Sequence, residues 1–257
     1  MLSKNKIKFI NSIKKKKYRE IHQCFFVEGE KLVDELLKSN NQSFEILATN
    51  EWVQDYQQNN DLKQNIEITE VTPEELKKIS SLSTPNKVLA IVKQPNYSFD
   101  YSKILTELSI FLDDINDPGN LGTIIRIADW FGIKNIFCSQ ESVDVFNPKV
   151  VQSTMGAIYR VKVHYVDSKE FLTEISKKED FKIYGTFLEG NNIYEEKLTT
   201  SGLIIMGSES HGISENVKPF VNTKLFIPNY PKDLKTSESL NISVATAIVC
   251  SEFRRRM

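Results

Sequence analysis

The sequence predicts an α/β protein with two domains. Its 257 residues are 40% hydrophobic and 10% aromatic, and a chain of this length usually forms more than one domain of about 100–150 residues. Strand-like runs alternate with helical stretches on both sides of Gln94–Lys103, whose Pro, Asn and Ser residues are typical of a linker. We therefore expect a small α/β domain over residues 1–95 and a larger one over residues 104–257.

The N-terminal domain begins with a basic segment. Residues 1–19 carry eight Lys or Arg and no acidic residue, although the formal charge of the whole chain is −1. Ile7, Ile10 and Ile13 recur there at helical spacing. The segment fits a solvated amphipathic helix and a polyanion-binding surface equally well.

The rest of this domain reads as alternating strands and helices. The predicted strands are Cys24–Glu28, Phe44–Ala48, Ile66–Val71 and Lys87–Lys93. The predicted helices lie near Glu30–Lys38, Trp52–Gln58 and Pro73–Ser80.

In the C-terminal domain the same alternation predicts a mostly parallel sheet covered by helices. Its expected strands are Leu108–Ile115, Lys134–Ser139, Val161–Val166, Phe181–Phe187, Leu203–Gly207 and Lys224–Pro228. The last helix, Leu240–Phe253, is apolar nearly all round and must be buried. Its pattern favours a core helix, and a subunit interface is the alternative.

Several function classes are excluded by the sequence. Cys24, Cys138 and Cys250 are widely spaced without a Cys-x-x-Cys pair, so we expect free buried thiols and no metal site. No run of about 18 apolar residues indicates a membrane segment, and the cytoplasm is the expected location. The fingerprints of dinucleotide-binding folds, phosphate-binding loops and serine hydrolases are absent.

Three loops after predicted strands carry polar residues where open parallel sheets bind ligands. The first, after Leu108–Ile115, leads into a helix with Asn120 near its N-cap and Arg126 about two turns inside, among apolar neighbours. A salt bridge or a cap would explain these residues without a ligand. An anion is the alternative partner for the guanidinium.

The second loop, Gly207–Gly212, places Glu209 between glycines that permit close approach of the backbone. His211 is a general base by type, although a polar turn residue is the commoner role. In the third, Ile227-Pro228 precedes a polar stretch, and Ser239 and Asn241 then open the last helix. Helix capping by Ser239 would account for this pair without catalysis.

Taken in order, these segments resemble the motifs of the SpoU family, within the knotted SPOUT class of methyltransferases. The three motifs are Asn120–Arg126, Gly207–Gly212, and Ile227-Pro228 with Ser239–Val244. Two further stretches support the likeness. Phe146–Gly156 is similar to a helix between the first two motifs, and Phe26–Lys31 resembles the start of the family's substrate-binding domain.

The resemblance implies an S-adenosyl-L-methionine-dependent RNA methyltransferase that acts on a ribose 2′-hydroxyl of rRNA or tRNA. It further implies a homodimer, a C-terminal trefoil knot, and a ribosomal-protein-like N-terminal domain that binds the RNA. The expected cofactor-binding residues are Thr186, Gly207, Ile227 and Leu240. The stretch 229–238 is longer and more polar than the family usually has, which makes the role of Ile227 less secure than that of Leu240.

The expected catalytic residues are Asn120, Arg126, Glu209, Ser239 and Asn241. Because a guanidinium is a poor base at neutral pH, we expect Arg126 to grip the adjacent phosphate and to favour the developing alkoxide electrostatically, with the other four residues fixing its orientation. Two rival functions stay open: a non-catalytic RNA-binding protein on the same fold, and methyl transfer to a base.

Overall fold

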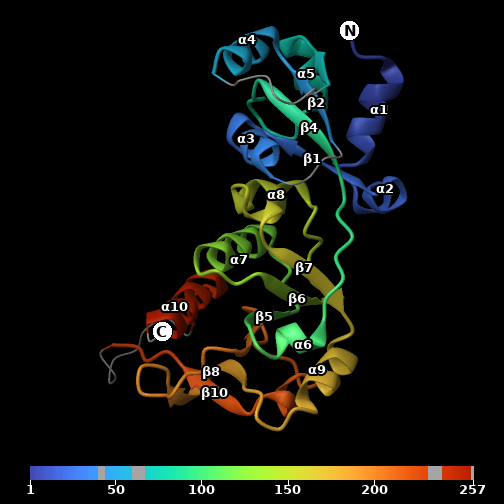
Figure 1. Cartoon of the computed structure of the whole chain (residues 1–257). Coiled ribbons are helices and arrows are strands. Elements are labelled where there is room, and N and C mark those ends of the chain that lie inside the picture. Colours follow the sequence, from blue (N-terminus) through green and yellow to red (C-terminus); the bar gives the residue numbers. More distant parts are fainter. Residues whose placement is uncertain (40–43, 60–66, 231–238, 256–257) are drawn as a thin grey trace. The chain divides into compact units, whose positions relative to one another are not determined.

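The computed structural model describes residues 1–39, 44–59, 67–230 and 239–255 (Figure 1). Contacts within the chain divide it into two compact units. Unit 1 consists of residues 1–96 together with 144–159, and unit 2 of residues 97–143 together with 160–257. The segment 144–159, which lies inside the second predicted domain, therefore packs with the N-terminal residues.

Unit 1 is built on a mixed four-stranded sheet in the order β1-β4-β2-β3. Strands β1 and β2 each pair antiparallel with β4, and β3 pairs parallel with β2. Its elements are α1 (Lys4–Ser12), α2 (Lys16–His22), β1 (Cys24–Glu28), α3 (Glu30–Lys38), β2 (Phe44–Ala48), α4 (Asn50–Asn59), β3 (Ile68–Glu70), α5 (Pro73–Ile79), β4 (Val88–Lys93), α8 (Pro148–Thr154) and the short helix η1 (Ala157–Tyr159). The predicted strands and helices of this part are confirmed, apart from Ile66, which lies outside the described residues.

The basic N-terminal segment is helical, as its spacing indicated, but it forms two short helices. Helix α1 ends at Ser12, and α2 begins at Lys16. The carbonyl groups of Ile13 and Lys14 accept hydrogen bonds from the Arg19 guanidinium, at 3.0 and 2.7 Å. In a continuous helix these two carbonyl groups would accept hydrogen bonds from main-chain N–H groups. Here the Arg19 side chain donates to them instead.

Unit 2 contains a six-stranded sheet in the order β10-β8-β9-β5-β6-β7, and every neighbouring pair in it is parallel. Its elements are α6 (Tyr101–Ile104), β5 (Leu108–Asp113), α7 (Pro118–Trp130), β6 (Asn135–Ser139), β7 (Lys162–Val166), α9 (Ser168–Ser176), β8 (Ile183–Asn192), β9 (Gly202–Gly207), the short helix η2 (Lys218–Phe220), β10 (Thr223–Phe226) and α10 (Ile242–Arg255). The parallel, helix-covered sheet expected from the sequence is confirmed.

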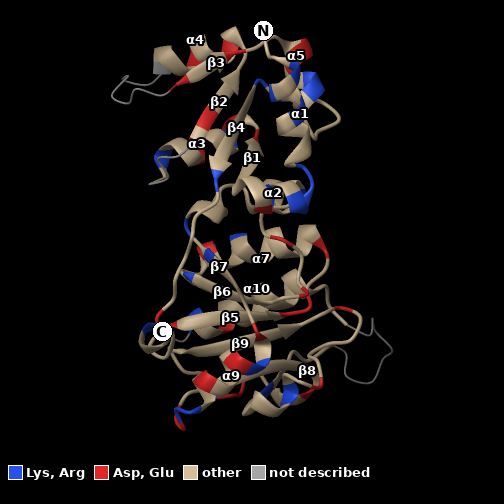
Figure 2. Cartoon of the chain, turned by 90° about the vertical axis from the view of Figure 1, so that its right-hand side faces the viewer, with Lys and Arg blue, Asp and Glu red and all other residues tan. Residues whose placement is uncertain are grey.

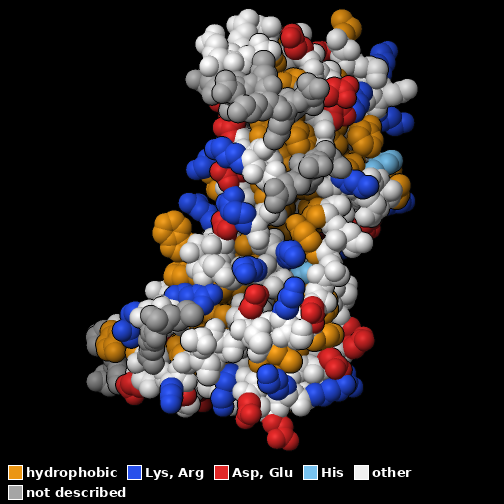
Figure 3. Space-filling model, viewed as in Figure 1, with side chains coloured by type: hydrophobic (Ala, Val, Ile, Leu, Met, Phe, Trp, Pro, Cys, Tyr) orange, Lys and Arg blue, Asp and Glu red, His pale blue; other side chains and the backbone are white. Residues whose placement is uncertain are grey.

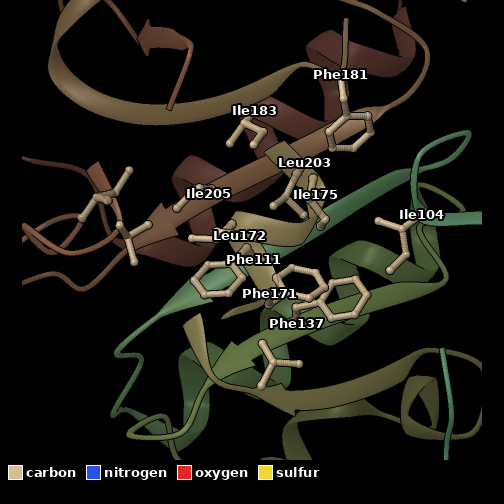
Figure 4. Close-up of a cluster of buried hydrophobic side chains, with 13 residues drawn as sticks. Ile104, Phe111, Phe137, Phe171, Leu172, Ile175, Phe181, Ile183, Leu203 and Ile205 are labelled. Carbon is tan, nitrogen blue, oxygen red and sulfur yellow. The ribbon is translucent and has the colours of Figure 1, made fainter. Parts of the chain in front are cut away.

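Helices cover both faces of this sheet. Side chains alternate between the faces along each strand, and Phe111, Phe137 and Leu203 share a buried cluster with Phe171 of α9. Figure 4 shows Phe111, Phe171 and Phe137 next to one another, and the ring centroids of Phe137 and Phe171 are 4.3 Å apart.

The opposite face is covered by α7 and α10, which pack against each other. There Tyr184 of β8 meets the edge of Phe253 of α10, with ring centroids 4.9 Å apart. The last helix therefore contributes to the core, as its pattern favoured. The sheet is held between α9 on one side and the α7–α10 pair on the other, which leaves the ends of its strands to the loops.

The trefoil knot stays a prediction, because residues 231–238, which connect β10 with α10, lie outside the described residues. Among the helices of the described ranges, none has the length and apolar character needed to cross a membrane. Basic and acidic residues are spread over both units, as the colours of the cartoon show (Figure 2).

Candidate active site at the carboxyl ends of the strands

The first predicted loop connects β5 with α7 and is shaped by a helix cap. The Asp117 carboxylate accepts a hydrogen bond from the main-chain N–H of Asn120 at 2.8 Å, and Pro118 occupies the first helical turn. Asp117 is thus the N-cap, and Asn120 belongs to the first turn. Because its main chain is fixed in the helix, the Asn120 side chain is free to act at the strand ends.

The second loop folds back on the end of β9. A Cβ atom on Gly207 would lie 2.1 Å from the carbonyl carbon of Gly212, so no larger residue fits there. Ser208 and Gly212 bond to each other through both main-chain N–H groups. The buried Asp113 at the end of β5 accepts a bond of 2.7 Å from the N–H of Ser214. These contacts hold the loop that carries Glu209.

The third loop ends in an asparagine cap on α10. The Asn241 side-chain oxygen accepts bonds from the N–H groups of Ser243 and Val244, at 3.0 and 3.4 Å. The interpretation of Ser239 as the cap was therefore wrong, because the helix begins at Ile242, two residues later than that cap would require. Asn241 is fixed by the same bonds that start the helix.

The three loops meet in one hydrogen-bonded network. The Asn241 amide nitrogen donates to Glu209 Oε1 at 2.6 Å and to Asn120 Oδ1 at 2.9 Å. Glu209 Oε1 also accepts from the N–H of Ile242 at 3.2 Å. Residues 121 positions apart in the chain are thus joined through one amide group, and three of the five expected catalytic residues lie together.

Ser243 belongs to this network and was missed as a site residue. Its hydroxyl lies 2.6 Å from Asn241 Oδ1 and 3.1 Å from Asn120 Oδ1, and its side chain is buried. Serine in a first helical turn is ordinary in a sequence, so only its place within the third motif could have drawn attention to it. In the structure its single hydroxyl hydrogen is shared between the two amide oxygens, the shorter contact being to Asn241.

The network fixes which way the Asn120 amide points. Its oxygen faces two donors, from Asn241 and Ser243, which assigns the amide orientation. The nitrogen forms no hydrogen bond with another described residue. The Asn120 amide therefore presents N–H donors at the site.

Arg126 and Ser239 lie outside this network. Both side chains are exposed, and neither forms a hydrogen bond or ion pair with another residue of the described ranges. An exposed guanidinium on α7, the helix that also carries Asn120, is well placed to meet an anionic ligand. The structure brings neither side chain into contact with Glu209.

The expected cofactor residues cluster at the same edge of the sheet. Gly207 is the last residue of β9. Ile227 directly follows β10, which pairs with β8, the neighbour of β9 in the sheet. The Thr186 hydroxyl donates to the carbonyl of Ile205 at 3.4 Å. Thr186 also begins the stretch of β8 over which the pairing with β10 shifts register. Leu240 is 45% exposed just before α10.

These residues fit a ligand that is recognised through the main chain. The N–H and C=O groups of Ile227 and Leu240 form no hydrogen bond with another described residue. Such groups can bind the amine, carboxylate and adenine of S-adenosylmethionine. In the described ranges no group of three His, Cys, Asp or Glu residues could hold a metal ion.

His211 is held locally within its loop. Its Nδ1 lies 2.8 Å from the hydroxyl of Ser210, and its side chain is exposed. No bond connects it to the network of Asn120, Glu209 and Asn241. The structure thus shows it as a polar turn residue beside the site.

Two family models match the sequence. Residues 107–251 match the SpoU rRNA Methylase family, and residues 4–90 match the MRM3-like substrate binding domain. The first match includes all the expected site residues.

Curated proteins and solved structures agree with these matches. The chain is 30% identical to the 23S rRNA (guanosine(2553)-2′-O)-methyltransferase RlmP of Bacillus subtilis over 251 residues. These residues cover 97% of this chain and 96% of that protein. A protein from Porphyromonas gingivalis assigned to the TrmH family of RNA methyltransferases is 37% identical, with a TM-score of 0.87 and full coverage of both chains. The AdoMet-bound rRNA methyltransferase from Sinorhizobium meliloti is 26% identical, with a TM-score of 0.84 over 100% of this chain and 97% of that one.

Proposed function

This chain belongs to the SpoU rRNA methylase family, and from that premise we propose that it transfers a methyl group from S-adenosylmethionine to a ribose 2′-hydroxyl of RNA. The observation that carries the proposal is the network in which Asn241 joins Glu209 to Asn120 at the carboxyl ends of the strands. Because RlmP is named for a guanosine of 23S rRNA, large-subunit rRNA is the substrate to test first, and tRNA the second.

The cofactor site in this proposal consists of Gly207, Ile227 and Leu240, with Thr186 beside them. S-adenosylmethionine supplies an electrophilic methyl group on a sulfonium. The role of these residues is to hold its polar groups with main-chain donors and acceptors.

The catalytic residues act by position and charge. Arg126 binds the phosphate next to the target ribose and stabilises the negative charge that develops on its 2′-oxygen. The Asn120 amide donates from the network to the same nucleotide, while Glu209, Asn241 and Ser243 fix its orientation. Ser239 contacts the RNA from the start of the segment that leads into α10. Holding the hydroxyl in line with the methyl group supplies much of the rate enhancement.

The proposal includes a homodimer in the cytoplasm. Trp130 at the end of α7 is 85% exposed, and Val244 and Leu240 near the start of α10 are 50% and 45% exposed. These large apolar side chains lie on or just before two packed helices, and their exposure is typical of a surface that a second copy covers.

The product distinguishes ribose methylation from its rivals. A ribose 2′-hydroxyl attacks the neighbouring phosphate in alkali, so methylating it protects one phosphodiester bond. We expect large-subunit rRNA treated with the protein and S-adenosylmethionine to contain one alkali-resistant bond. Methyl label in RNA whose bonds all stay alkali-labile would move the acceptor to a base. If the protein binds RNA but transfers no methyl label to any RNA tested, it is a non-catalytic RNA-binding protein.

Cofactor binding is tested separately by calorimetry. We expect S-adenosylmethionine to bind in the presence of a chelator, because main-chain groups and not a metal hold it. Binding that disappears with the chelator would contradict this part of the proposal.

A further inference from the structure

Helix α2 of unit 1 carries a dense positive charge on its exposed side. Lys15, Lys16 and Lys17 are all exposed, and Glu20 is the one acidic residue among the first 23. Glu20 lies 3.9 Å from Lys16 in an exposed pair, which neutralises little. Lys15 and Lys17 form no ion pair with a described residue. The charge of this segment is therefore available to a polyanion.

Aromatic side chains lie on the same helix. Tyr18 and His22, one helical turn apart, hold their rings within 13° of parallel with centroids 6.5 Å apart. The edge of Phe9 from α1 meets His22 at 5.1 Å and holds that ring in place. Tyr18 is 37% exposed and the adjacent Ile21 59%. Figure 3 shows histidine, basic and hydrophobic side chains meeting at the surface where Figure 1 places α2.

A buried ion pair fixes the orientation of this short helix. Arg19 is 3% exposed, and its guanidinium donates to Asp144 Oδ2 through Nε at 3.0 Å and Nη2 at 2.6 Å. A helix of seven residues is too short to be stable by itself. Because Arg19 points into unit 1, the lysines and Tyr18 on the remaining faces are turned to solvent.

A solvated helix would explain the lysines alone, but it gives no reason for exposing Tyr18, His22 and Ile21 among them. We infer that α2, with Lys15, is an RNA-binding surface whose lysines contact phosphates and whose Tyr18–His22 pair stacks against an unpaired base. Basic and aromatic side chains in combination are the means by which proteins bind single-stranded nucleic acid. The inference rests on the proposed function for its choice of RNA, and it adds where and in which form the RNA is bound.

The test measures RNA binding by fluorescence anisotropy, apart from methyl transfer. The probe is a labelled RNA hairpin with a single-stranded loop, compared with a blunt RNA duplex. We expect replacement of Lys15, Lys16 and Lys17 by Ala to weaken hairpin binding at least 10-fold. It should also reduce the slope of log Kd against log salt concentration by about 2, since each lost phosphate contact removes roughly 0.7–0.9. The matched control replaces Lys169, Lys177 and Lys178, exposed lysines in and after α9, and should leave both values unchanged.

Base stacking is tested with substitutions of Tyr18 and His22. Tyr18→Ala with His22→Ala should weaken hairpin binding by roughly 5- to 100-fold and duplex binding far less, whereas Tyr18→Phe should retain the wild-type affinity. In methyl transfer the α2 variants should raise KM for RNA with little change in kcat and in S-adenosylmethionine affinity. Thermal unfolding identifies any variant that fails to fold.

The outcomes separate the surface from the reaction. Lysine variants of α2 that behave like the α9 control would overturn the RNA-binding surface. Equal losses for hairpin and duplex in the aromatic variant would overturn base stacking. If the wild-type protein binds the hairpin through α2 but methylates no RNA, the proposed function fails while this inference holds.

Discussion

Asn241 uses every hydrogen-bonding group of its side chain. Both amide hydrogens are donated, to Glu209 and Asn120, and the oxygen accepts from the first turn of α10. No residue other than asparagine offers two donors and an acceptor on so short a side chain. Asn120, Glu209 and Asn241 could be predicted as site residues because each lies in a motif, but their mutual contacts could not.

Replacing Arg126 should lower the rate of methyl transfer without changing the binding of S-adenosylmethionine. Its exposed side chain supports neither the network nor the fold, so Arg126→Ala should leave unfolding and S-adenosylmethionine affinity nearly unchanged. We expect turnover to fall by about 10²–10³-fold, the usual effect of losing one charge-stabilising donor. Single-turnover methyl transfer and calorimetry measure the two quantities. Normal turnover in the variant would remove Arg126 from the mechanism, and loss of cofactor binding would assign it a structural role.

At the scale of elements, β7 shows how packing changes the properties of a side chain. His164 lies buried with its ring stacked on Phe137 at 5.1 Å and near the edge of Phe99 at 5.2 Å. Burial, with a smaller contribution from Lys162, lowers the pKa of His164 to about 4. The alternation of β7 predicted a strand, but nothing in the sequence distinguished this histidine from one at the surface.

Stability should therefore decrease as the pH falls from about 6.5 to 4. In that range the unfolded chain binds a proton at His164 that the folded chain does not, so acid favours unfolding, by about 1–3 kcal/mol from this residue. His164→Phe keeps an aromatic ring in the cluster and removes the proton site. Urea unfolding at pH 7 and pH 5 should show a smaller loss in the variant than in the wild type. Equal losses in the two proteins would contradict the assignment.

On the scale of the whole molecule, the predicted elements combine into two units whose membership does not follow chain order. Residues 144–159 interrupt unit 2 and pack with unit 1, where Asp144 binds Arg19 and the ring of Phe146 meets that of Phe25 at 4.6 Å. A domain boundary predicted from a linker cannot detect that residues 144–159 pack with unit 1, because no change of composition marks this segment. The chain thus crosses between the units more than once.

In the proposed dimer, a second copy covers the exposed apolar side chains of α7 and of the start of α10. We expect light scattering to report twice the 29.6 kDa mass of the chain for the wild type. Val244→Glu should shift the protein toward monomers, because it places a charge where a partner would exclude water. The matched control, Thr173→Glu on α9, adds the same charge at an exposed position and should leave the mass unchanged. A wild-type monomer that methylates RNA would contradict the dimer.

The sequence by itself determined the elements of this protein, the parallel character of its larger sheet, and the motif residues that identify its family. These follow from local periodicity and from short segments whose residues are adjacent in the chain. Tertiary structure alone decided that Asn241 joins Glu209 to Asn120, that the Ser243 hydroxyl lies against Asn120, and that Arg19 holds α2 through Asp144. Each of these depends on hydrogen bonds whose donors and acceptors find one another only when the chain is folded, and no local pattern encodes such a pairing.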